Sequence, residues 1–508
     1  MEVLNLKLKF LKNAFILTLT SLILKSLGIV LKIYMSNTIG AEGMGLHQLI
    51  FSIYILASTF ATAGVSTAVI RLVGSEFTYG NKNNAKKVFK KCLFISIFLG
   101  LLSSTIIFLF ASPIGKYILN DVRTVIPIKI LVFVFPFMST ASCVKGYFIA
   151  RKNVSVPSKA QVYEQIIRLL FIFLALKRFA SYDIATKCIA IVVSDITAEI
   201  ISGIYSYIKY KADEKKLGYD FNKINTKTPV FKKFFSISLP ISMNRYANTI
   251  LHTIENVLVP NKLKAYSGSQ SMALAEFGML KGMAIPLIFF PASFLNAMST
   301  LLIPEMSEAM TLKNVDKIQF VVKKAIHITL IISILIAGIF FIFSYEISNL
   351  IYHENKVGFI IKILAPIIPF MYLESIVTGM LQGLNEQLSS LKYLLFDSII
   401  RIILVFIFVA KFGLTGFLGI MIISNISTSS LNLTRLIKVT GIKIEWTKWI
   451  IKPICSLGVA IFIFSKFITS SFSSIIFLVV GSVVISFTYI LGLFITRSIT
   501  INDLILKK

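Results

Sequence analysis

The chain contains an internal repeat of roughly 220 residues. Residues 128–170 align without a gap to residues 361–403, which lie 233 positions later, with 14 identities among the 43 aligned positions. The tripeptide Pro-Phe-Met at 136–138, for example, returns at 369–371. A repeat of this length sets the architecture before any single element is assigned. The sequence therefore predicts two copies of one structural unit, followed by a shorter C-terminal segment.

The repeated unit is strongly apolar. Of the 508 residues, 56% are hydrophobic and only 15% are charged, and the mean hydropathy is +0.83; soluble domains carry about 25% charged residues. Long apolar runs such as 93–110, 328–343 and 475–495 are each about long enough to cross a hydrocarbon core of roughly 30 Å as a helix. These features predict an all-α integral membrane protein.

Fourteen membrane-spanning helices are expected from these runs. They fall into two sets of six and a final pair, which predicts segments 1–222, 223–443 and 444–508. The first apolar run is expected to be an uncleaved membrane span and not a signal peptide, because no cleavage site follows it. The expected helices are about 12–36, 45–73, 89–112, 124–150, 158–179 and 184–209, then 233–259, 271–303, 323–346, 358–383, 391–411 and 413–438, then 448–468 and 473–496.

The basic residues lie mainly in alternate loops between these spans. The net charge of +29 would suggest nucleic-acid binding in a soluble protein. Here the lysines and arginines gather in loops such as 209–233, on the side that also holds both termini, by about three to one. Basic loops face the cytoplasm. We therefore expect cytoplasmic termini, two parallel repeats, and no nucleic-acid partner.

Two lysines fall inside the first predicted span. Lys25 lies about 13 residues into the helix, roughly 20 Å from its start, and Lys32 is seven residues later on the same face. A charge at the centre of a span costs about 2.5–3.5 kcal/mol, so such residues usually face a cavity or a partner. The two lysines are candidate ligands for an anionic headgroup; the alternative is that their side chains reach the membrane interface.

Further charged residues fall in the seventh and eighth predicted spans. Arg245 lies near the cytoplasmic end of the seventh span and is a third candidate for binding an anionic substrate. Glu255 lies deeper and is a candidate for coupling to a proton or sodium ion, or a member of a structural ion pair. Lys281 in the eighth span is either a cavity cation or a partner of Glu276.

Two acid–arginine pairs recur at the repeat offset. Glu164 and Arg168 are four residues apart, and so are their equivalents Asp397 and Arg401. This spacing with the acid first suits a salt bridge within one helix. Because both copies keep the pair, we expect a structural role within each half. Asp195 has no charged equivalent in the second copy and is a second candidate for ion coupling.

Sequence motifs for catalysis are missing. No phosphate-binding G-x-x-x-x-G-K-[ST] motif occurs, and the four cysteines have no metal-like spacing. We therefore expect no enzymatic activity, no cofactor and no metal site. Transport would have to be driven by an ion gradient, the membrane potential or the substrate gradient.

Three stretches resemble a known family of membrane proteins. The opening Asn-Thr-Ile-Gly-Ala-Glu-Gly-Met-Gly-Leu at 37–46 is similar to that of the polysaccharide-export branch of the MOP (multidrug/oligosaccharidyl-lipid/polysaccharide) superfamily. The stretches 275–286 and 302–309 resemble the stage V sporulation protein B group, close to the MurJ-type lipid II flippases. The resemblance extends over nearly the whole chain.

The resemblance implies a transporter with two six-helix lobes around a central V-shaped cavity. It implies export of an undecaprenyl-pyrophosphate-linked saccharide from the inner to the outer leaflet of the cell membrane, in peptidoglycan or spore-cortex synthesis. Family members commonly carry arginines where this chain has Lys25 and Lys32. Lysine keeps the charge for a phosphate but loses the bidentate fork of arginine.

Three functions remain open from the sequence. The first is a lipid-linked oligosaccharide flippase, with Lys25, Lys32, Arg245 and Lys281 binding the substrate. The second is a drug or cation antiporter of the same superfamily, which would use Glu255 or Asp195; the basic first span disfavours cationic drugs. The third is a membrane scaffold that recruits cell-wall or sporulation enzymes through loops such as 209–233.

Overall fold

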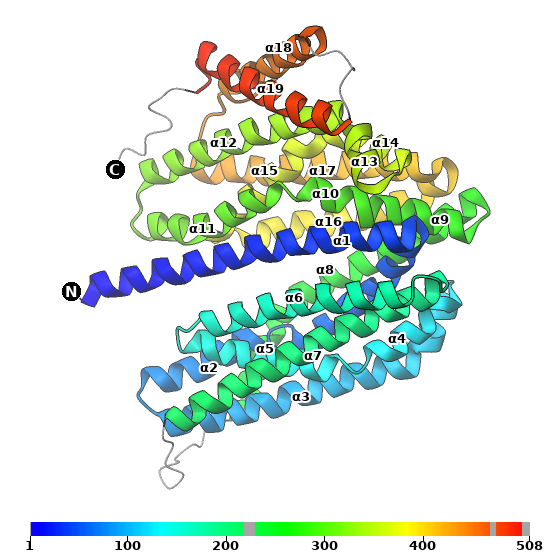
Figure 1. Ribbon diagram of the computed structural model, residues 1–508. Helices are drawn as coiled ribbons and strands as arrows, with labels where there is room; N and C mark the ends of the chain where they lie inside the picture. Colours follow the sequence, from blue (N-terminus) through cyan, green and yellow to red (C-terminus); the bar gives the residue numbers. More distant parts are fainter. Residues whose placement is uncertain (1, 218–228, 468–473, 500–508) are drawn as a thin grey trace. The chain divides into compact units, whose positions relative to one another are not determined.

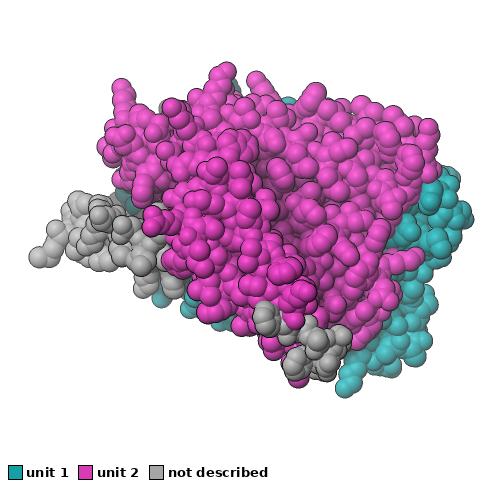
Figure 2. Space-filling view, turned by 90° about the horizontal axis from the view of Figure 1, so that it is seen from above, with its two compact units in different colours: residues 1–278 teal, residues 279–508 magenta. Residues whose placement is uncertain are grey.

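The structure, a computed structural model, describes residues 2–217, 229–467 and 474–499. Every regular element in these ranges is a helix. The chain divides into two compact units, Met1–Gly278 and Met279–Lys508, which Figure 2 distinguishes by colour. The predicted all-α class is confirmed for the described residues.

Unit 1 contains nine α-helices (Figure 1). Short π- and 3₁₀-helical turns at Ile114–Ile118 and Val122–Thr124 join α3 to α4. The helices are α1 (Glu2–Thr62), α2 (Val65–Thr78), α3 (Lys82–Pro113), α4 (Val125–Leu131), α5 (Phe135–Ala150), α6 (Ser155–Arg178), α7 (Ile184–Lys216), α8 (Val230–Ser267) and α9 (Gln270–Phe277).

Unit 2 continues from the π-helical turn η3 (Gly278–Ala284). Further short turns are η4 (Ala365–Ile367), η5 (Val405–Val409) and η6 (Thr447–Ile451). Its α-helices are α10 (Ile285–Phe289), α11 (Ala292–Thr311), α12 (Val315–Ile342), α13 (Ser344–Tyr352), α14 (Asn355–Leu364), α15 (Ile368–Gly383), α16 (Gln387–Leu404), α17 (Ala410–Thr440), α18 (Lys452–Phe467) and α19 (Ser474–Ile495).

Apolar helices long enough to cross a membrane run through both units. The described residues contain nine such stretches, or ten when the bent pair Val122–Leu131 and Phe135–Ala150 is taken as one span. Two of the nine, Leu19–Thr78 and Gln387–Thr440, hold 60 and 54 residues. Because about 20 residues cross the bilayer, each of these holds more than one crossing. The count is compatible with the predicted 14 spans.

Glycines mark the breaks inside the two longest stretches. Gly40 in α1 has φ 69° and Gly413 in α17 has φ 57°, both in the left-handed region that side chains with a Cβ rarely adopt. Gly40 lies between the predicted spans 12–36 and 45–73, and Gly413 is the first residue of the predicted span 413–438. In α1 the helix continues on both sides of Gly40, so two predicted spans form one kinked helical element.

Several elements differ from the sequence prediction. The single helix expected at 124–150 is divided into α4 and α5, which are bent by 46°. The helix expected at 271–303 is interrupted by η3 and then broken near Pro291, between α10 and α11. Proline removes a backbone donor and disfavours a helical residue before it, which accounts for the break. The short helix α13 was predicted as loop, because its nine residues are too few to give a clear apolar period.

The internal repeat extends to the packing of individual residues. A Cβ on Gly146 of α5 would lie 2.7 Å from the carbonyl oxygen of Ser66 in α2. At the 233-residue offset, a Cβ on Gly379 of α15 would lie 2.1 Å from the hydroxyl oxygen of Ser299 in α11. Equivalent glycines therefore let equivalent helix pairs approach closely, one pair in each unit.

The compact units do not follow the predicted segments. α8 and α9 belong to the second repeat by sequence, yet α8 packs against α1, α2 and α9 within unit 1. The compact units are defined by which helices pack together. The predicted segments 1–222, 223–443 and 444–508 are defined by the internal repeat of the sequence. The three-segment division stays a prediction.

Candidate functional site

The interior of unit 1 holds a polar cavity of about 440 Å³. We call it the Arg168 cavity. The helices α1, α5, α6 and α7 supply most of its wall, and α6 and α7 run side by side (Figure 1). Its polar lining includes Lys32, His47, Glu164, Arg168, Asp195 and Glu199.

Arg168 sits among three carboxylates in this cavity. Its Nη2 lies 2.8 Å from Oε1 of Glu164 and 3.5 Å from Oε2 of Glu199. Its Nε lies 3.1 Å from Oδ1 of Asp195. All four side chains are between 13% and 22% exposed, so the cluster is largely shielded from solvent. Three acids around one guanidinium leave two formal negative charges when all are ionised.

The local sequence explains how the cluster forms. Glu164 and Arg168 are one helical turn apart on α6, and Asp195 and Glu199 are one turn apart on α7. Residues four apart lie on the same helix face. Because α6 and α7 pack together, the two faces meet and the planar fork of Arg168 can contact acids from both helices. The predicted partners Glu164 and Arg168 lie within ion-pair distance in unit 1.

A second polar cavity of about 380 Å³ adjoins the first. Glu164, Glu199, Gln161 and Met138 line both cavities, so the two share a wall. Its basic lining residues are Lys145 of α5 and Arg245 of α8, and we call it the Arg245 cavity. Both cations are exposed and lie outside ion-pair distance of any carboxylate in the described chain.

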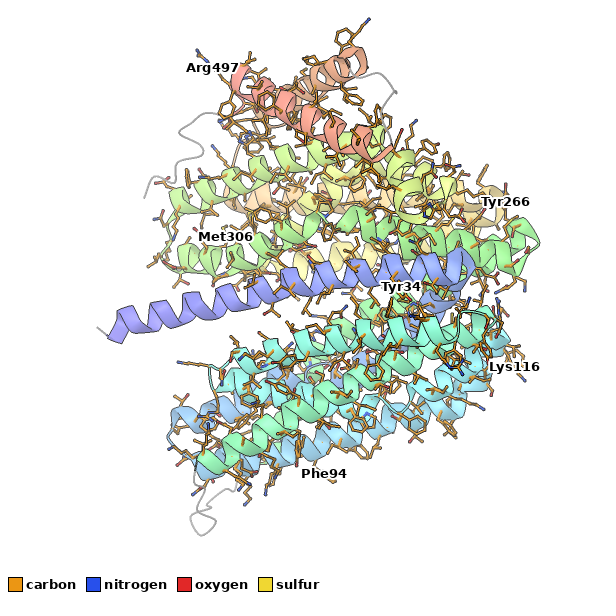
Figure 3. All side chains as sticks on the ribbon, in the orientation of Figure 1. Tyr34, Phe94, Lys116, Tyr266, Met306 and Arg497 are labelled. Carbon is orange, nitrogen blue, oxygen red and sulfur yellow. The ribbon has the colours of Figure 1, made fainter. Side chains whose placement is uncertain are left out.

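The two lysines of the first span are placed differently. Lys32 lines the Arg168 cavity, whereas Lys25, two turns earlier on α1, is half-buried and does not line it. Tyr34, labelled in Figure 3, fixes α1 against α6: its ring lies 5.3 Å from that of Phe173 and its hydroxyl donates to the Phe173 carbonyl oxygen at 3.4 Å.

The remaining candidates are spread over both units. Glu255 of α8 is 2% exposed and lies ten residues beyond Arg245. Lys281 lies in η3 of unit 2, where its Nζ stands 5.8 Å from the ring centroid of Phe417. This cation–π contact is a role that the sequence did not predict.

Unit 2 holds a smaller version of the acid–arginine cluster. Arg401 Nη2 lies 3.8 Å from Oδ2 of Asp397, so the second predicted pair is also present. The Ser424 hydroxyl lies 2.7 Å from both oxygens of Asp397, and Thr428 donates to Glu374 at 3.5 Å. At the positions of Asp195 and Glu199 this copy has Thr428 and Asn432, so hydroxyl and amide groups replace two carboxylates.

Several residues of the site escaped the sequence analysis. Glu199 was not among the predicted site residues, although its Oε2 lies 3.5 Å from Nη2 of Arg168. Lys145 and His47 were not considered, although each lies inside a predicted helix that should be apolar. A charge inside a span was the signal already applied to Lys25, and the same test would have found Lys145.

Metal binding gains no support from the described residues, which contain no group of three or more His, Cys, Asp or Glu side chains arranged to hold a metal ion. The cysteines Cys92, Cys143 and Cys188 are buried singly in helices. The cavity chemistry is therefore that of ammonium, guanidinium, carboxylate and amide groups.

Comparison with known proteins places the chain in a family. A family model described as "polysaccharide biosynthesis protein" matches residues 10–310, more than half of the chain. The chain belongs to the polysaccharide biosynthesis protein family. A second model, MatE, matches residues 261–407. These matches confirm the resemblance predicted from the sequence.

Individual relatives agree with this placement. Stage V sporulation protein B of Bacillus subtilis is 24% identical over 469 residues, which cover 92% of this chain and 89% of that protein. Lipid II flippase MurJ of the same organism is 23% identical over 424 residues, covering 78% of this chain and 76% of that protein. The apolar helices of the described residues agree with a multi-pass membrane protein.

The fold is shared with a solved flippase structure. An inward closed conformation of lipid II flippase MurJ matches with a TM-score of 0.71 at 16% identity, covering 94% of this chain and 98% of that one. At this identity the match establishes the fold alone. The predicted MATE/MurJ-like fold is confirmed.

Proposed function

We propose that this protein is a flippase for an undecaprenyl-pyrophosphate-linked saccharide. The proposal rests most directly on the cations of unit 1. Lys32 lines the Arg168 cavity, and Lys145 and Arg245 line the adjoining Arg245 cavity. None of the three forms an ion pair within the described chain, whereas the nearby acids are already gathered around Arg168.

Cations without acidic partners inside a membrane protein favour an anionic ligand. Positive charge gathered along a cavity is compensated when a ligand brings the opposite charge. A pyrophosphate carries two or more negative charges and accepts hydrogen bonds from lysine and arginine. Lys25 and Lys281 are proposed as further contacts along the path. The relative MurJ is, by its name, a flippase of lipid II, which supports this choice of substrate class.

Direction of transport follows from the proposed orientation. We place the protein in the cell membrane with both termini in the cytoplasm, because the basic loops lie on that side of the predicted topology. Moving negative charge outward across an inside-negative membrane is favoured by about 2.3 kcal/mol per charge per 100 mV. The membrane potential can therefore drive alternating access without a nucleotide, and cell-wall or sporulation enzymes would supply and consume the substrate.

A cation-coupled antiporter is the second candidate function. The observation that favours it is the surplus of acids around Arg168, since three carboxylates sharing one guanidinium can take up a proton or sodium ion. Asp195 belongs to this cluster, and Glu255 is a separate buried acid on α8. A cation bound there could also couple to the flippase, so ion dependence alone does not separate the two functions.

The identity of the transported substrate distinguishes the flippase from the antiporter. We would reconstitute the purified protein in liposomes and measure translocation of fluorescent lipid II at an imposed inside-negative potential. Wild type should flip it, and the double variant Lys25→Ala/Lys32→Ala should lose at least about tenfold in rate, because each buried cation contributes a charge-assisted contact of about 1.5–3 kcal/mol. The variant Lys116→Ala/Lys177→Ala, with two lysines removed outside the cavities, is the control.

Three outcomes decide the proposal. Loss in the cavity variant alone supports the assigned roles. Equal rates for all three proteins would exclude Lys25 and Lys32 as substrate ligands. Absence of lipid II translocation by wild type, together with export of a cationic dye driven by sodium or protons, would replace the flippase with the antiporter.

A further inference from the structure

Unit 1 carries a basic pocket on its periphery that the proposed function does not use. It lies where the start of α3 meets the start of α8 and has a volume of about 630 Å³. We call it the lysine pocket. The residues that give it its character are Lys86, Lys87, Lys90, Lys91, Phe94 and Phe231. No carboxylate is among its described lining residues.

The lysines share one face of α3. Lys87, Lys90 and Lys91 are three and four residues apart, which brings their side chains together on a helix. Lys90 and Lys91 are exposed and Lys87 is half-buried. Lys87 and Lys91 lie one turn apart, and their ammonium groups repel one another, so a negatively charged ligand between them would be stabilising.

One acid contacts a lysine of the pocket. Glu214 of α7 contacts Lys86 at 3.0 Å, but it also contacts Lys211 at 3.0 Å. One carboxylate is thus shared by two ammonium groups. The positive charge of Lys87 and Lys91 has no such acidic partner within the described chain.

Two exposed aromatic side chains also line the pocket. Phe94, one turn beyond Lys91, is 74% exposed, and Phe231 in the first turn of α8 is 68% exposed. Figure 3 labels Phe94 on α3. Exposed aromatic rings beside a cluster of charges are costly in water but suit the boundary between headgroups and acyl chains.

The position along α3 sets the depth of the pocket in the membrane. Lys91 is followed by an uncharged stretch that lasts until Lys116, and this stretch is apolar enough to cross the bilayer. The lysines therefore lie at the level of the lipid headgroups, and Phe94 lies at the top of the acyl region. α8 begins at the same level, with Pro229 and Val230 also lining the pocket.

We propose that the lysine pocket binds one anionic phospholipid of the surrounding bilayer. Its phosphate would contact Lys87, Lys90 and Lys91, and its acyl chains would lie against Phe94 and Phe231. Basic pockets between membrane helices at the headgroup level have the chemistry for this ligand. The apolar wall distinguishes it from a site for a soluble anion, which would gain nothing from two exposed rings. The bound lipid would link the start of α8 to α3 within unit 1.

Native mass spectrometry of the detergent-purified protein can test the proposal. Phosphatidylglycerol, phosphatidylcholine and glycerol 3-phosphate would be titrated onto wild type and onto Lys87→Gln/Lys90→Gln/Lys91→Gln. The control variant, Lys313→Gln/Lys323→Gln/Lys324→Gln, removes the same charge in unit 2, and Lys323 and Lys324 are the repeat equivalents of Lys90 and Lys91. Wild type should bind phosphatidylglycerol in preference to phosphatidylcholine, and the pocket variant should lose at least about tenfold in affinity.

Each other outcome overturns the assignment. Wild-type affinity in the pocket variant would exclude these lysines, and an equal loss in the control would show only general surface attraction. Displacement of phosphatidylglycerol by millimolar glycerol 3-phosphate would make the pocket a soluble-anion site. If the triple variant does not purify as a monodisperse protein, Phe94→Ser/Phe231→Ser is used instead, and unchanged phosphatidylglycerol binding in it would overturn the acyl contact. Flipping is not measured, so the result is independent of the proposed function.

Discussion

Gly45 and Gly278, which occupy equivalent positions in the two repeats, pack backbone against backbone in unit 1. A Cβ on Gly278 would lie 2.0 Å from the carbonyl oxygen of Ala41 and 2.5 Å from the amide nitrogen of Gly45. A Cβ on Gly45 would lie 2.0 Å from the carbonyl oxygen of Leu274. The two copies of one ancestral glycine thus meet where α1 crosses α9. Helix pairs in membranes approach this closely only when small residues line the contact.

Substituting either glycine should separate the two helices. We expect Gly45→Ala and Gly278→Ala each to lower the thermal midpoint of the detergent-purified protein by several degrees, because backbone atoms cannot move aside for a methyl group as a flexible side chain can. Gly419→Ala is the matched control, since no atom lies within 4 Å of its added Cβ. A midpoint for Gly278→Ala equal to that of Gly419→Ala would contradict the close contact.

Removing Arg168 should destabilise unit 1 more than removing Arg401 destabilises unit 2. Arg168→Met leaves three buried carboxylates without their cation, at a cost of about 3 kcal/mol or more, whereas Arg401→Met leaves Asp397 still bonded to Ser424. Thermal unfolding of both variants measures the difference. Adding Glu199→Gln to Arg168→Met should recover part of the loss, and a further drop would show that the acids do not repel one another.

Lys32 should act through its charge. Lys32→Arg is expected to keep most of the lipid II translocation rate of wild type, and Lys32→Ala to lose about tenfold, because a phosphate accepts hydrogen bonds from either cation. The reconstituted flipping assay compares the two. Loss in Lys32→Arg as large as in Lys32→Ala would indicate that the shape of the lysine, rather than its charge, is required.

Acid should weaken one surface contact in unit 2. Glu386 lies between α15 and α16, and hydrogen bonds from the Arg435 guanidinium, at 2.7 and 3.0 Å, and from the Ser389 hydroxyl lower the pKa of its carboxyl below the usual 4.5. A carboxyl with a lowered folded-state pKa stabilises the fold above its unfolded pKa, and the stabilisation is lost as the pH falls through the folded value.

The thermal midpoints of wild type and Glu386→Gln, measured between pH 7 and pH 3, test whether this stabilisation is lost in acid. At neutral pH wild type should be more stable than Glu386→Gln by less than about 1 kcal/mol of unfolding free energy, because solvent screens an exposed ion pair. The gap should close toward pH 3. A gap that widens in acid would contradict the assigned direction of the pKa shift.

The prediction of the fold from sequence succeeded where periodicity and repetition are strong. The apolar runs gave the helices, and the offset of 233 gave equivalences that reappear as matched contacts, Gly146 with Ser66 and Gly379 with Ser299. Merged elements such as α1 could not be foreseen, because apolar composition does not distinguish a bend at Gly40 from a loop. The short helix α13 was missed for lack of a period.

The site was only partly predictable. The sequence identified Lys32, Glu164, Arg168 and Asp195 as buried charges, and all four line one cavity. It did not bring Lys145 and Arg245 together, since these residues are 100 positions apart on α5 and α8. Nor could it show that the fork of Arg168 reaches acids on two helices.

Composition and the internal repeat by themselves determined that this chain is a duplicated bundle of membrane helices with charges inside its spans. Both properties can be read along the linear sequence. The length of the apolar runs determines how many membrane crossings exist, and a repeat at fixed spacing in the sequence becomes a repeat in the structure. Tertiary structure alone decided which charges neutralise one another and which do not. That choice depends on how the faces of α6 and α7 meet, because an ion pair forms only within about 4 Å and no pattern of spacing between helices encodes that distance.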